Sequence, residues 1–464
     1  MLENTLNRLD PDVNGPEEPP RLMTVLTMGC RVNQFESAAM GQGGVGRGYR
    51  LVEAGEVADL VVINTCSVTG ESDRQARQLI RRAVREYPDA RIVVTGCYAQ
   101  RAPENVAALP GVDLVLGNGE KGRLWEVMEE MALQDSHERI RVGDVSRLTE
   151  VPLSDPVDHF GDRSRAFLHA QDGCDRACAY CLIPSVRGPS RSVPLQRVVE
   201  QAQHFLEAGY EELVLTGVNI GAYGRDFQVP SSLAGLVQAL LDLPGLGRLR
   251  LSSLDPLDID QELVTLFATR ERLCGYLHLS IQSGDDGVRK RMGRGRGRRE
   301  VLERIAWVRK ARPEVVFGAD FIAGFPSETE EAFAQTVALT SEAELSLLHV
   351  FPYSVRPDTL AAAMPSSLWV SGEQIRERAL RLRQAGEAQL ARVLVKRLGC
   401  TETVLVETVE EGWGSGKTDG FLPMRFPEAR AEWRGGLLSV RVVGIDEKSN
   451  SLLGRVVEAV SHEE

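Results

Sequence analysis

Short apolar runs and amphipathic segments alternate along the first part of the chain. The apolar runs, which predict buried strands, lie at residues 22–28, 59–65, 91–96 and 113–117. Residues 72–88 repeat apolar positions at helical spacing, and Ser72 can cap their first turn. Strands that alternate with helices favour a parallel sheet, so we expect an open α/β domain over residues 21–134.

A glycine-rich segment interrupts this pattern where a helix is expected between the first two strands. Residues 41–50 contain five glycines. Each glycine inside a helix costs about 1 kcal/mol relative to alanine. We therefore expect a poor helix here, which would weaken the N-terminal domain.

A second series of strands and helices follows the polar segment 135–165, whose Pro152 and Pro156 are typical of a linker. Its apolar runs, expected as strands, lie at residues 166–170, 212–217, 249–253, 277–282, 315–325 and 347–353. Six such units favour a partial (βα)6 barrel over residues 166–395 rather than an open sheet. Residues 396–464 change to short β-rich runs, which predict a small all-β domain of about five strands.

Composition and charge narrow the possible classes of protein. Of 464 residues, 43% are hydrophobic and 26% are charged, which is the balance of a folded globular chain. The net charge of -12 excludes a protein that is basic throughout but leaves room for a local basic patch. Residues 1–20 are expected to be a flexible leader without the apolar core of a signal peptide, and no run is long enough to cross a membrane. We therefore expect a cytoplasmic location, where thiols stay reduced.

Eight cysteines in such a chain point to metal binding or catalysis before disulfides. Cys174, Cys178 and Cys181 form a CxxxCxxC motif just after the first barrel strand, at the mouth where barrel active sites form. Three thiolates can hold three irons of a cubane and leave the fourth iron open to a cofactor or substrate. The alternative is zinc, but a structural zinc site needs four ligands and no nearby Cys or His completes the set.

Cys30, Cys66 and Cys97 each follow a different expected strand of the first domain. The carboxyl ends of parallel strands share one edge of a sheet, where open α/β folds bind ligands. These three cysteines can therefore converge on a second cluster, and the alternative is three unrelated buried thiols. Cys274 and Cys400 have no partner at ligand spacing, so we expect both to be structural.

Four motifs around these cysteines together resemble the radical-SAM methylthiotransferase family. They are GCRVNQFES at 29–37, NTCSV at 64–68, TGCYAQ at 95–100 and GCDRACAYCLIP at 173–184. The resemblance covers residues 22–464 and implies an N-terminal methylthiotransferase domain, a radical-SAM barrel and a C-terminal TRAM domain. It also implies S-adenosylmethionine (SAM) and two four-iron–four-sulfur clusters as cofactors. The CxxxCxxC cysteines would hold the SAM-cleaving cluster, and the three cysteines of the first domain would hold the auxiliary cluster that carries sulfur.

The same resemblance implies further residues around SAM. The candidate cofactor-binding residues are Tyr180, Gly217, Asn219, Asp320 and Gly324. Tyr180 would lie near the adenine of SAM. The segment GADFIAGFPSE at 318–328 resembles the GFPGET element of the family, with Ser327 in place of a glycine. We expect His278 to belong to a buried network rather than to act as a metal ligand.

Two segments indicate the substrate. LTGVNIGAYG at 215–224 and HVFPYSVRPDT at 349–359 are most similar to the branch that modifies threonylcarbamoyladenosine beside the tRNA anticodon. Asn219 and Tyr223 would offer hydrogen bonds and a stacking face to that polar group at the barrel mouth. The branches that act on isopentenyladenosine in tRNA, or on an aspartate of a ribosomal protein, are the alternatives. The expected reaction adds a methylthio group to the adenine ring.

The most basic segment, residues 289–312, contains eleven Lys/Arg and two Glu. Contact with tRNA phosphates is one interpretation, and a solvated helix face is the other. The candidate RNA-binding residues are Arg289, Arg294, Arg296, Arg298 and Arg299. In the acidic β domain, aromatic side chains could stack on unpaired bases beside Arg425, or they could belong to the core. These aromatic residues are Trp413, Phe421 and Phe426.

An aromatic C–H bond is too inert for polar chemistry, so insertion at this carbon requires a radical from a cofactor. We therefore interpret the chain as a transferase that acts on tRNA. An electron donor of the flavodoxin or ferredoxin type and a sulfur source would be further partners. A non-catalytic iron–sulfur protein that binds RNA and senses redox state is the alternative from another class. The CxxxCxxC motif favours the enzyme, because an open iron is a liability in a sensor.

Overall fold

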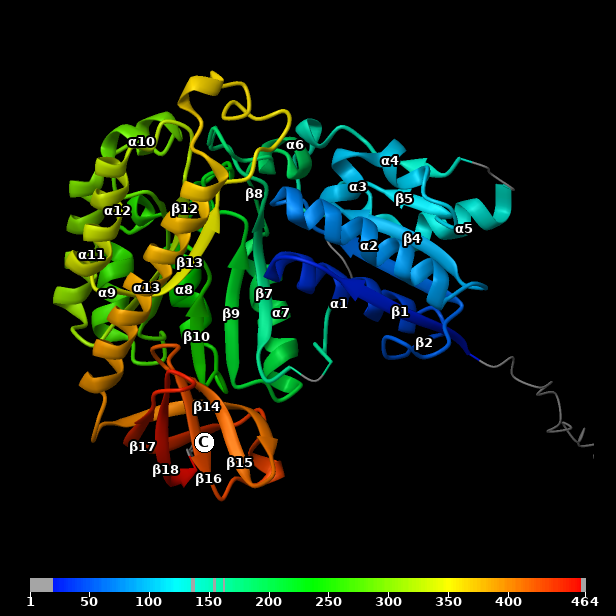
Figure 1. The fold of residues 1–464 in the computed structure, drawn as a ribbon. Coiled ribbons are helices and arrows are strands. Elements are labelled where there is room, and N and C mark those ends of the chain that lie inside the picture. The colour runs from blue at the N-terminus through cyan, green and yellow to red at the C-terminus, as the bar shows by residue number, and fades with distance from the viewer. Residues whose placement is uncertain (1–19, 135–137, 153–155, 162, 460–464) are drawn as a thin grey trace, which may run out of the picture.

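The computed structural model describes residues 20–134, 138–152, 156–161 and 163–459, so the expected leader lies outside the described residues except for Pro20. Along the chain an open sheet covered by helices is followed by a half-barrel and then by a small closed β-barrel (Figure 1). This arrangement confirms the expected α/β fold class with its small all-β C-terminal part. In Figure 1 the blue N-terminal sheet lies beside the green half-barrel, and the orange and red β-barrel lies below it.

The N-terminal sheet is parallel and has the strand order β2-β1-β3-β4-β5-β6. Its strands are β1 (Arg21–Thr27), β2 (Tyr49–Leu51), β3 (Leu60–Thr65), β4 (Arg91–Gly96), β5 (Leu114–Leu116) and β6 (Ile140–Arg141). The helices are α1 (Arg31–Val45), α2 (Gly70–Glu86), α3 (Cys97–Arg101), α4 (Pro103–Ala107) and α5 (Leu124–Gln134). Every residue of β3 is buried, as in a parallel sheet that is covered on both faces. Strand β6 belongs to this sheet although it lies in the segment expected to be a linker.

The expectation of a poor helix at residues 41–50 is wrong, because α1 continues through this segment to Val45. The reason is tertiary packing. A Cβ atom added at Gly44 would lie 2.3 Å from the sulfur of Met23 and 2.8 Å from the ring of Trp125. The missing side chain therefore lets α1 approach β1 and α5 closely, and this burial outweighs the low helix propensity of glycine.

The half-barrel consists of two sheets with the strand orders β10-β9-β7-β8 and β11-β12-β13. The strands are β7 (Ala166–Asp172), β8 (Arg191–Ser192), β9 (Glu212–Gly217), β10 (Arg248–Leu251), β11 (Tyr276–Gln282), β12 (Val316–Ala323) and β13 (Leu345–Pro352). Isolated bridges join the two sheets, for example between Leu254 and Leu279. All the pairs are parallel except the pair between β7 and the short β8. The six longer strands are therefore the six that the apolar runs predict.

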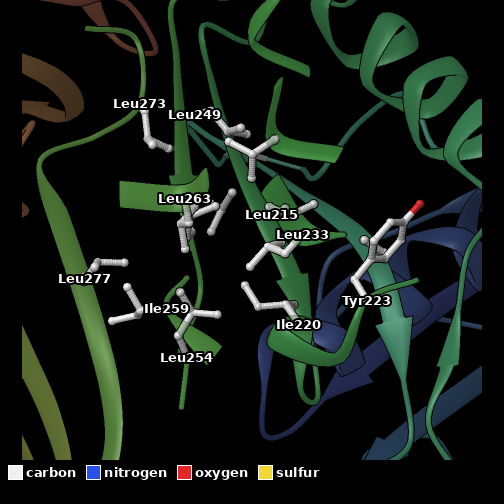
Figure 2. Close-up of a cluster of buried hydrophobic side chains, with 14 of the residues drawn as sticks. Leu215, Ile220, Tyr223, Leu233, Leu249, Leu254, Ile259, Leu263, Leu273 and Leu277 are labelled. Carbon is white, nitrogen blue, oxygen red and sulfur yellow. The ribbon is translucent and has the colours of Figure 1, made fainter. Parts of the chain in front are cut away.

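Helices cover the outside of the half-barrel. They are α6 (Ile183–Arg187), α7 (Leu195–Glu207), α8 (Leu233–Leu241), α9 (Gln261–Thr269), α10 (Asp286–Arg291), α11 (Arg298–Ala311), α12 (Glu330–Glu342) and α13 (Gly372–Lys396). Between the helices and strands lies a continuous apolar core, part of which is drawn in Figure 2. Tyr223 belongs to this core: it is buried and its hydroxyl donates to the carbonyl of Val193 at 3.0 Å. The expectation that Tyr223 offers a stacking face to the substrate is therefore wrong.

The C-terminal strands close into a barrel with the order β14-β15-β16-β18-β17. They are β14 (Thr401–Glu410), β15 (Trp413–Thr418), β16 (Pro423–Pro427), β17 (Leu437–Asp446) and β18 (Ser451–Ala459). Phe426 is fully buried in its core, and Phe421 stacks on Tyr276 of the half-barrel with ring centres 5.1 Å apart. Neither phenylalanine is free to stack on RNA, whereas Trp413 is 42% exposed and lies beneath Arg425.

Candidate active site

The three cysteines of the N-terminal domain converge at the carboxyl edge of its sheet. Cys30 follows β1, Cys66 follows β3 and Cys97 begins α3 directly after β4. Gly29 has a φ of 94°, and a Cβ atom there would lie 2.8 Å from the sulfur of Cys66. Gly96 has a φ of 98°, and a Cβ atom there would lie 2.3 Å from the carbonyl oxygen of Thr65. Glycine is therefore required at both turns for the cysteine loops to meet.

Two asparagines tie these loops together. The Asn33 amide donates to the carbonyls of Met28 and Thr65 at 2.8 and 2.9 Å, so it joins the ends of β1 and β3. The Asn118 amide donates to the carbonyl of Val186 at 2.6 Å and lies 3.9 Å from the sulfur of Cys97. Both side chains are buried. The first contact fixes the site within the sheet, and the second connects it to the half-barrel.

The CxxxCxxC loop leaves the end of β7 and is held by backbone hydrogen bonds. The amide of Cys174 donates to the carbonyl of Gly188 at 3.1 Å, and the amide of Ala179 donates to the carbonyl of Met292 at 2.9 Å. The sulfur of Cys181 accepts from the amide of Ile183 at 3.4 Å. These bonds orient the loop at the carboxyl end of the parallel strands, where barrel active sites form.

Burial disfavours the thiolate form of one cysteine in each set. Burial raises the pKa of Cys66 to about 11 and the pKa of Cys181 to about 11, because a thiolate loses its hydration there. Iron reverses this penalty by replacing the proton on sulfur. Buried cysteines that are inert as thiols therefore suit a role as cluster ligands.

Among the described residues, one group of metal-ligating side chains has donor atoms that all lie within 4.8 Å of one another, and it consists of His278, Asp320 and His349. The two cysteine sets are not part of this group, so they remain separate candidate ligand sets.

The structure brings several of the expected SAM residues close to the CxxxCxxC loop. Tyr180 packs edge-on against Phe325, which follows Gly324, with ring centres 6.5 Å apart. Asn219 lines a pocket together with Asp175 and Arg176 of the loop itself. Burial raises the pKa of Tyr180, so the phenol stays protonated. These contacts support a cofactor site above the loop.

The remaining candidates for SAM binding have structural roles that the sequence alone does not show. A Cβ atom at Gly217 would lie 2.9 Å from the carbonyl oxygen of Gln171, so glycine is needed where β9 meets β7. Gly324 has a φ of 79° and its amide donates to Glu328 at 2.7 Å. Ser327 has a φ of 73°, which explains why the resembling element carries glycine at that position.

Asp320 belongs to a buried polar network on the inner face of the half-barrel. One of its oxygens lies 2.9 Å from Nε2 of His278 and 3.2 Å from Nδ1 of His349. The other ring nitrogen of His278 lies 2.8 Å from the hydroxyl of Tyr276. His278 is therefore a network histidine, as expected from the sequence. Burial alone would raise the pKa of Asp320, but both histidines outweigh it and lower that pKa.

Two of the five arginines expected to contact RNA are instead buried in the protein. Arg289 donates to the carbonyl of Ile281 at 2.6 Å, and Arg294 pairs with Asp255 at 3.0 Å. Both are corrections to the expected RNA-binding set, because a side chain that is sealed by internal bonds cannot reach a phosphate. They hold the loop between α10 and α11 against the CxxxCxxC segment.

The other three arginines of that set differ in exposure. Arg298 is half-buried and pairs with Glu342 at 2.5 Å. Arg296 is exposed, and Arg299 is 82% exposed with a long contact of 3.5 Å to Glu303. Because the loop lies against the barrel mouth, Arg296 and Arg299 are the members that remain available to a polyanion.

Arg187, which the sequence does not single out, lies between the two cysteine sets. It is fully buried at the end of α6 and donates to Asp172 at 2.8 Å, two residues before Cys174. It also donates to Asn33 at 2.6 Å and to Glu36 at 3.0 Å, both on α1. One guanidinium therefore joins the loops of both candidate clusters. Its burial and its partners become visible only in the folded chain.

Two domain models match this chain. The family described as "Uncharacterized protein family UPF0004" matches residues 23–117, and the "Radical SAM superfamily" matches residues 168–340. The threonylcarbamoyladenosine tRNA methylthiotransferase MtaB of Rickettsia prowazekii is 40% identical over 91% of this chain and 95% of its own length. The chain belongs to the radical-SAM methylthiotransferase family. Members of this family use SAM and four-iron–four-sulfur clusters, which confirms the expected cofactors.

Other relatives and solved structures agree with this placement. MtaB of Bacillus subtilis is 34% identical over 94% of this chain and 96% of its own length. The tRNA-2-methylthio-N(6)-dimethylallyladenosine synthase of Geobacter metallireducens is 32% identical over 94% of this chain and 98% of its own length. The radical SAM methyltransferase TsrM of Kitasatospora setae, solved with cobalamin and a 4Fe-4S cluster, has a TM-score of 0.56 at 15% identity over 74% of this chain and 77% of its own. At that identity, TsrM supports the fold alone.

Within the described part of the chain, no helix is both long and apolar enough to span a bilayer.

Proposed function

We propose that this chain adds a methylthio group to the adenine ring of threonylcarbamoyladenosine in tRNA. The observation that carries the proposal is the presence of two converging cysteine sets, one at each sheet, which Arg187 joins. A radical-SAM enzyme without a second cluster site would need only the CxxxCxxC loop. Relatives named for threonylcarbamoyladenosine span nearly the whole chain at 33–40% identity and support this substrate.

Each cysteine set has its own role in this proposal. Cys174, Cys178 and Cys181 would hold the cluster that binds SAM, and the set at the edge of the N-terminal sheet would hold the sulfur-bearing cluster. When bound, these groups supply a radical that can act on an inert aromatic carbon and the sulfur that becomes the methylthio group. The chain itself orients the loops and holds Tyr180 near the pocket that Asn219 lines.

The tRNA would approach across the barrel mouth. Arg296 and Arg299 are exposed there, and a positively charged loop attracts the phosphates of an anticodon arm. Trp413 and Arg425 of the C-terminal barrel offer a stacking surface at a second point. A loop base is unstacked more cheaply than a duplex base, so the target adenine can reach the site from an anticodon loop.

Relatives named as dimethylallyladenosine synthases, at 32% identity, define the second candidate substrate. That substituent is apolar, whereas the inner face of the half-barrel presents Tyr276, His278, Asp320 and His349. These groups already bond to one another, so an apolar substituent gains no hydrogen bond from them, whereas a polar substituent can form additional ones. The polar face therefore favours threonylcarbamoyladenosine.

A direct experiment compares substrates on the reconstituted enzyme. The protein is loaded with iron and sulfide without oxygen and incubated with SAM, a reductant and one of three substrates, namely either tRNA or the ribosomal protein. The methylthio product on each substrate is measured by mass spectrometry. We expect the methylthio product on threonylcarbamoyladenosine tRNA and none on dimethylallyladenosine tRNA or on ribosomal protein. Product on dimethylallyladenosine tRNA alone would overturn the substrate. Nucleosides from cells with and without the gene provide the second measurement.

The cluster assignment is tested by counting iron. We expect about eight irons per chain, as two cubanes require. Alanine at the three cysteines of the CxxxCxxC motif should halve the iron content and abolish SAM cleavage. Alanine at Cys30, Cys66 and Cys97 should also halve the iron content but leave SAM cleavage intact. Cys400→Ser is the matched control, because this exposed thiol lies outside both sets. Full iron content in either triple variant would disprove the assignment.

The proposal also covers the partners of the enzyme. An electron must reach the SAM-binding cluster in every cycle, so we include a donor of the flavodoxin or ferredoxin type. The auxiliary cluster loses sulfur to the product, so a sulfur source must restore it. With tRNA as the substrate, the cytoplasm is the proposed location.

A further inference from the structure

Arg31 has no ion pair or hydrogen bond within the ranges that the structure describes. It is the first residue of α1 and follows Cys30 directly. Helix α1 packs against β7 and β9, and in Figure 1 its dark blue start lies beside β7. The Cζ atom of Arg31 lies 5.9 Å from the ring centre of Phe167 in β7. The side chain therefore points from the edge that carries the N-terminal cysteines into the half-barrel.

Arg31 forms no ion pair or hydrogen bond with any side chain or carbonyl in the described part of the protein. The guanidinium nitrogens of Arg31 are not completely buried, so a ligand can reach them. Burial lowers the pKa of Arg31, because the charged guanidinium has lost much of its water. A half-buried charge without a counter-ion is costly, and a ligand can supply the missing charge.

Glu212, a carboxylate that acts electrostatically on Arg31, cannot neutralise it, because other arginines already occupy it. Glu212 is fully buried and pairs with Arg165 at 2.9 Å, Arg248 at 2.5 Å and Arg250 at 3.0 Å. Arg165 and Arg250 act electrostatically on Arg31 as like charges. The inner face of the half-barrel at this point therefore carries an excess of positive charge, which suits an anionic group.

Hydrogen-bonding groups continue from this charge along the same face. Tyr276 lies close enough to Arg31 to act on it electrostatically, and its hydroxyl is bonded to His278 at 2.8 Å. His278 in turn reaches Asp320, and its ring lies 4.4 Å from that of His349. A small polar group beside Arg31 would thus meet donors and acceptors rather than apolar side chains.

We propose that Arg31 binds the carboxylate of the threonyl group on the substrate nucleoside, and so selects threonylcarbamoyladenosine over dimethylallyladenosine. The inference rests on the proposed function and names the residue that decides its substrate. The threonylcarbamoyl group carries a carboxylate, whereas the dimethylallyl group carries no charge. A guanidinium binds a carboxylate through two parallel hydrogen bonds, which lysine cannot reproduce. Because Arg31 follows Cys30, a base held at the auxiliary site has its substituent within reach of this side chain.

The test compares two substrates and four proteins. The substrates are tRNA with threonylcarbamoyladenosine and the same tRNA whose threonyl carboxylate has been converted to its neutral methylamide. The proteins are the anaerobically reconstituted wild type, Arg31→Gln, Arg31→Lys and the control Arg81→Gln, which alters an exposed arginine of α2. Iron content per chain shows that each variant keeps its fold and clusters. The kcat and KM for the methylthio product are measured for each pair.

We expect Arg31→Gln to lower kcat/KM on the carboxylate substrate by about 10²-fold, mainly through KM, as for a truncated buried charge pair. The wild type should discriminate against the methylamide by a similar factor, and Arg31→Gln should not. Arg31→Lys should lie between, and Arg81→Gln should match the wild type.

Two outcomes would overturn the inference in different ways. Equal kcat/KM of the wild type on the carboxylate and methylamide substrates would exclude carboxylate recognition even if Arg31→Gln failed to fold. If a folded Arg31→Gln variant keeps the kcat/KM of the wild type on the carboxylate substrate, another residue must recognise the carboxylate. Absence of product from the wild type on threonylcarbamoyladenosine tRNA, with product on dimethylallyladenosine tRNA, would instead refute the proposed function itself and the inference with it.

Discussion

Replacing Arg187 with methionine should separate the two cluster-bearing parts of the molecule. The side chain is 1% exposed and donates to Glu36, Asp172 and Asn33, so its removal leaves two buried carboxylates with fewer partners. Removing one member of a buried ion pair costs about 3–5 kcal/mol. Lys121 still contacts Glu36 at 2.5 Å and Arg191 still contacts Asp172 at 3.3 Å. We therefore expect the lower end, about 3 kcal/mol.

Urea unfolding of the reconstituted protein, followed by circular dichroism, measures this loss. The first transition should move to lower urea in Arg187→Met, and Arg187→Lys should lie between because it keeps the charge but loses the forked geometry. Arg197→Met is the matched control, since its pair with Glu200 is 59% and 42% exposed and such pairs contribute little. If Arg187→Met unfolds at the same urea concentration as this control, Arg187 does not link the two parts.

The same network predicts how stability depends on pH. Burial alone would raise the pKa of Glu36, but Arg187 and Lys121 outweigh it and hold that pKa well below its ordinary value. A carboxyl whose pKa is lowered by folding contributes fully above its unfolded pKa of about 4.3. Its contribution is lost as the pH falls from there toward the folded pKa. The difference in urea midpoint between wild type and Arg187→Met should therefore shrink below about pH 4, and a constant difference would contradict the argument.

Two further predictions concern packing and RNA binding. Gly44→Ala should destabilise the protein by about 1–2 kcal/mol, because overpacking against Met23 and Trp125 exceeds the gain in helix propensity. Gly46→Ala is the control, because a Cβ atom there meets only carbonyl oxygens at 3.7 Å or more. Equal urea midpoints for the two variants would refute the packing argument. Neutralising Arg296 and Arg299 together should reduce the slope of log affinity for tRNA against log salt by about two, measured by fluorescence anisotropy, and an unchanged slope would leave them as a solvated surface.

The sequence by itself determined most of the strands of this protein and indicated its candidate cluster ligands. Strands of the parallel sheets are continuous apolar runs, because both of their faces are buried. Such runs can be predicted from the sequence alone. The strands of the C-terminal barrel differ, because positions in β15 and β16 alternate between buried and more exposed, as in a strand with one face toward a core. The convergence of Cys30, Cys66 and Cys97 can also be predicted, because each cysteine follows a strand. The carboxyl ends of parallel strands lie at one edge of a sheet whatever the details of packing.

Only the tertiary structure decided which side chains near those elements remain available. Arg289 and Arg299 look alike in a basic run, yet one is sealed by carbonyls of the barrel and the other is exposed. Tyr223 lies in a loop at the mouth, yet its ring completes the core. Burial depends on neighbours that are distant in sequence, so local pattern cannot assign it.

The same reason explains the two arginines that carry the new predictions. Arg187 joins α1 to the CxxxCxxC loop across about 150 positions of sequence, and its partners are polar residues without a motif. Arg31 stands inside a motif, but its importance comes from the counter-ion that it lacks, because three other arginines occupy Glu212. The sequence shows which charged residues a chain contains. Which of them stay unpaired is settled only when the chain folds and distant charges meet.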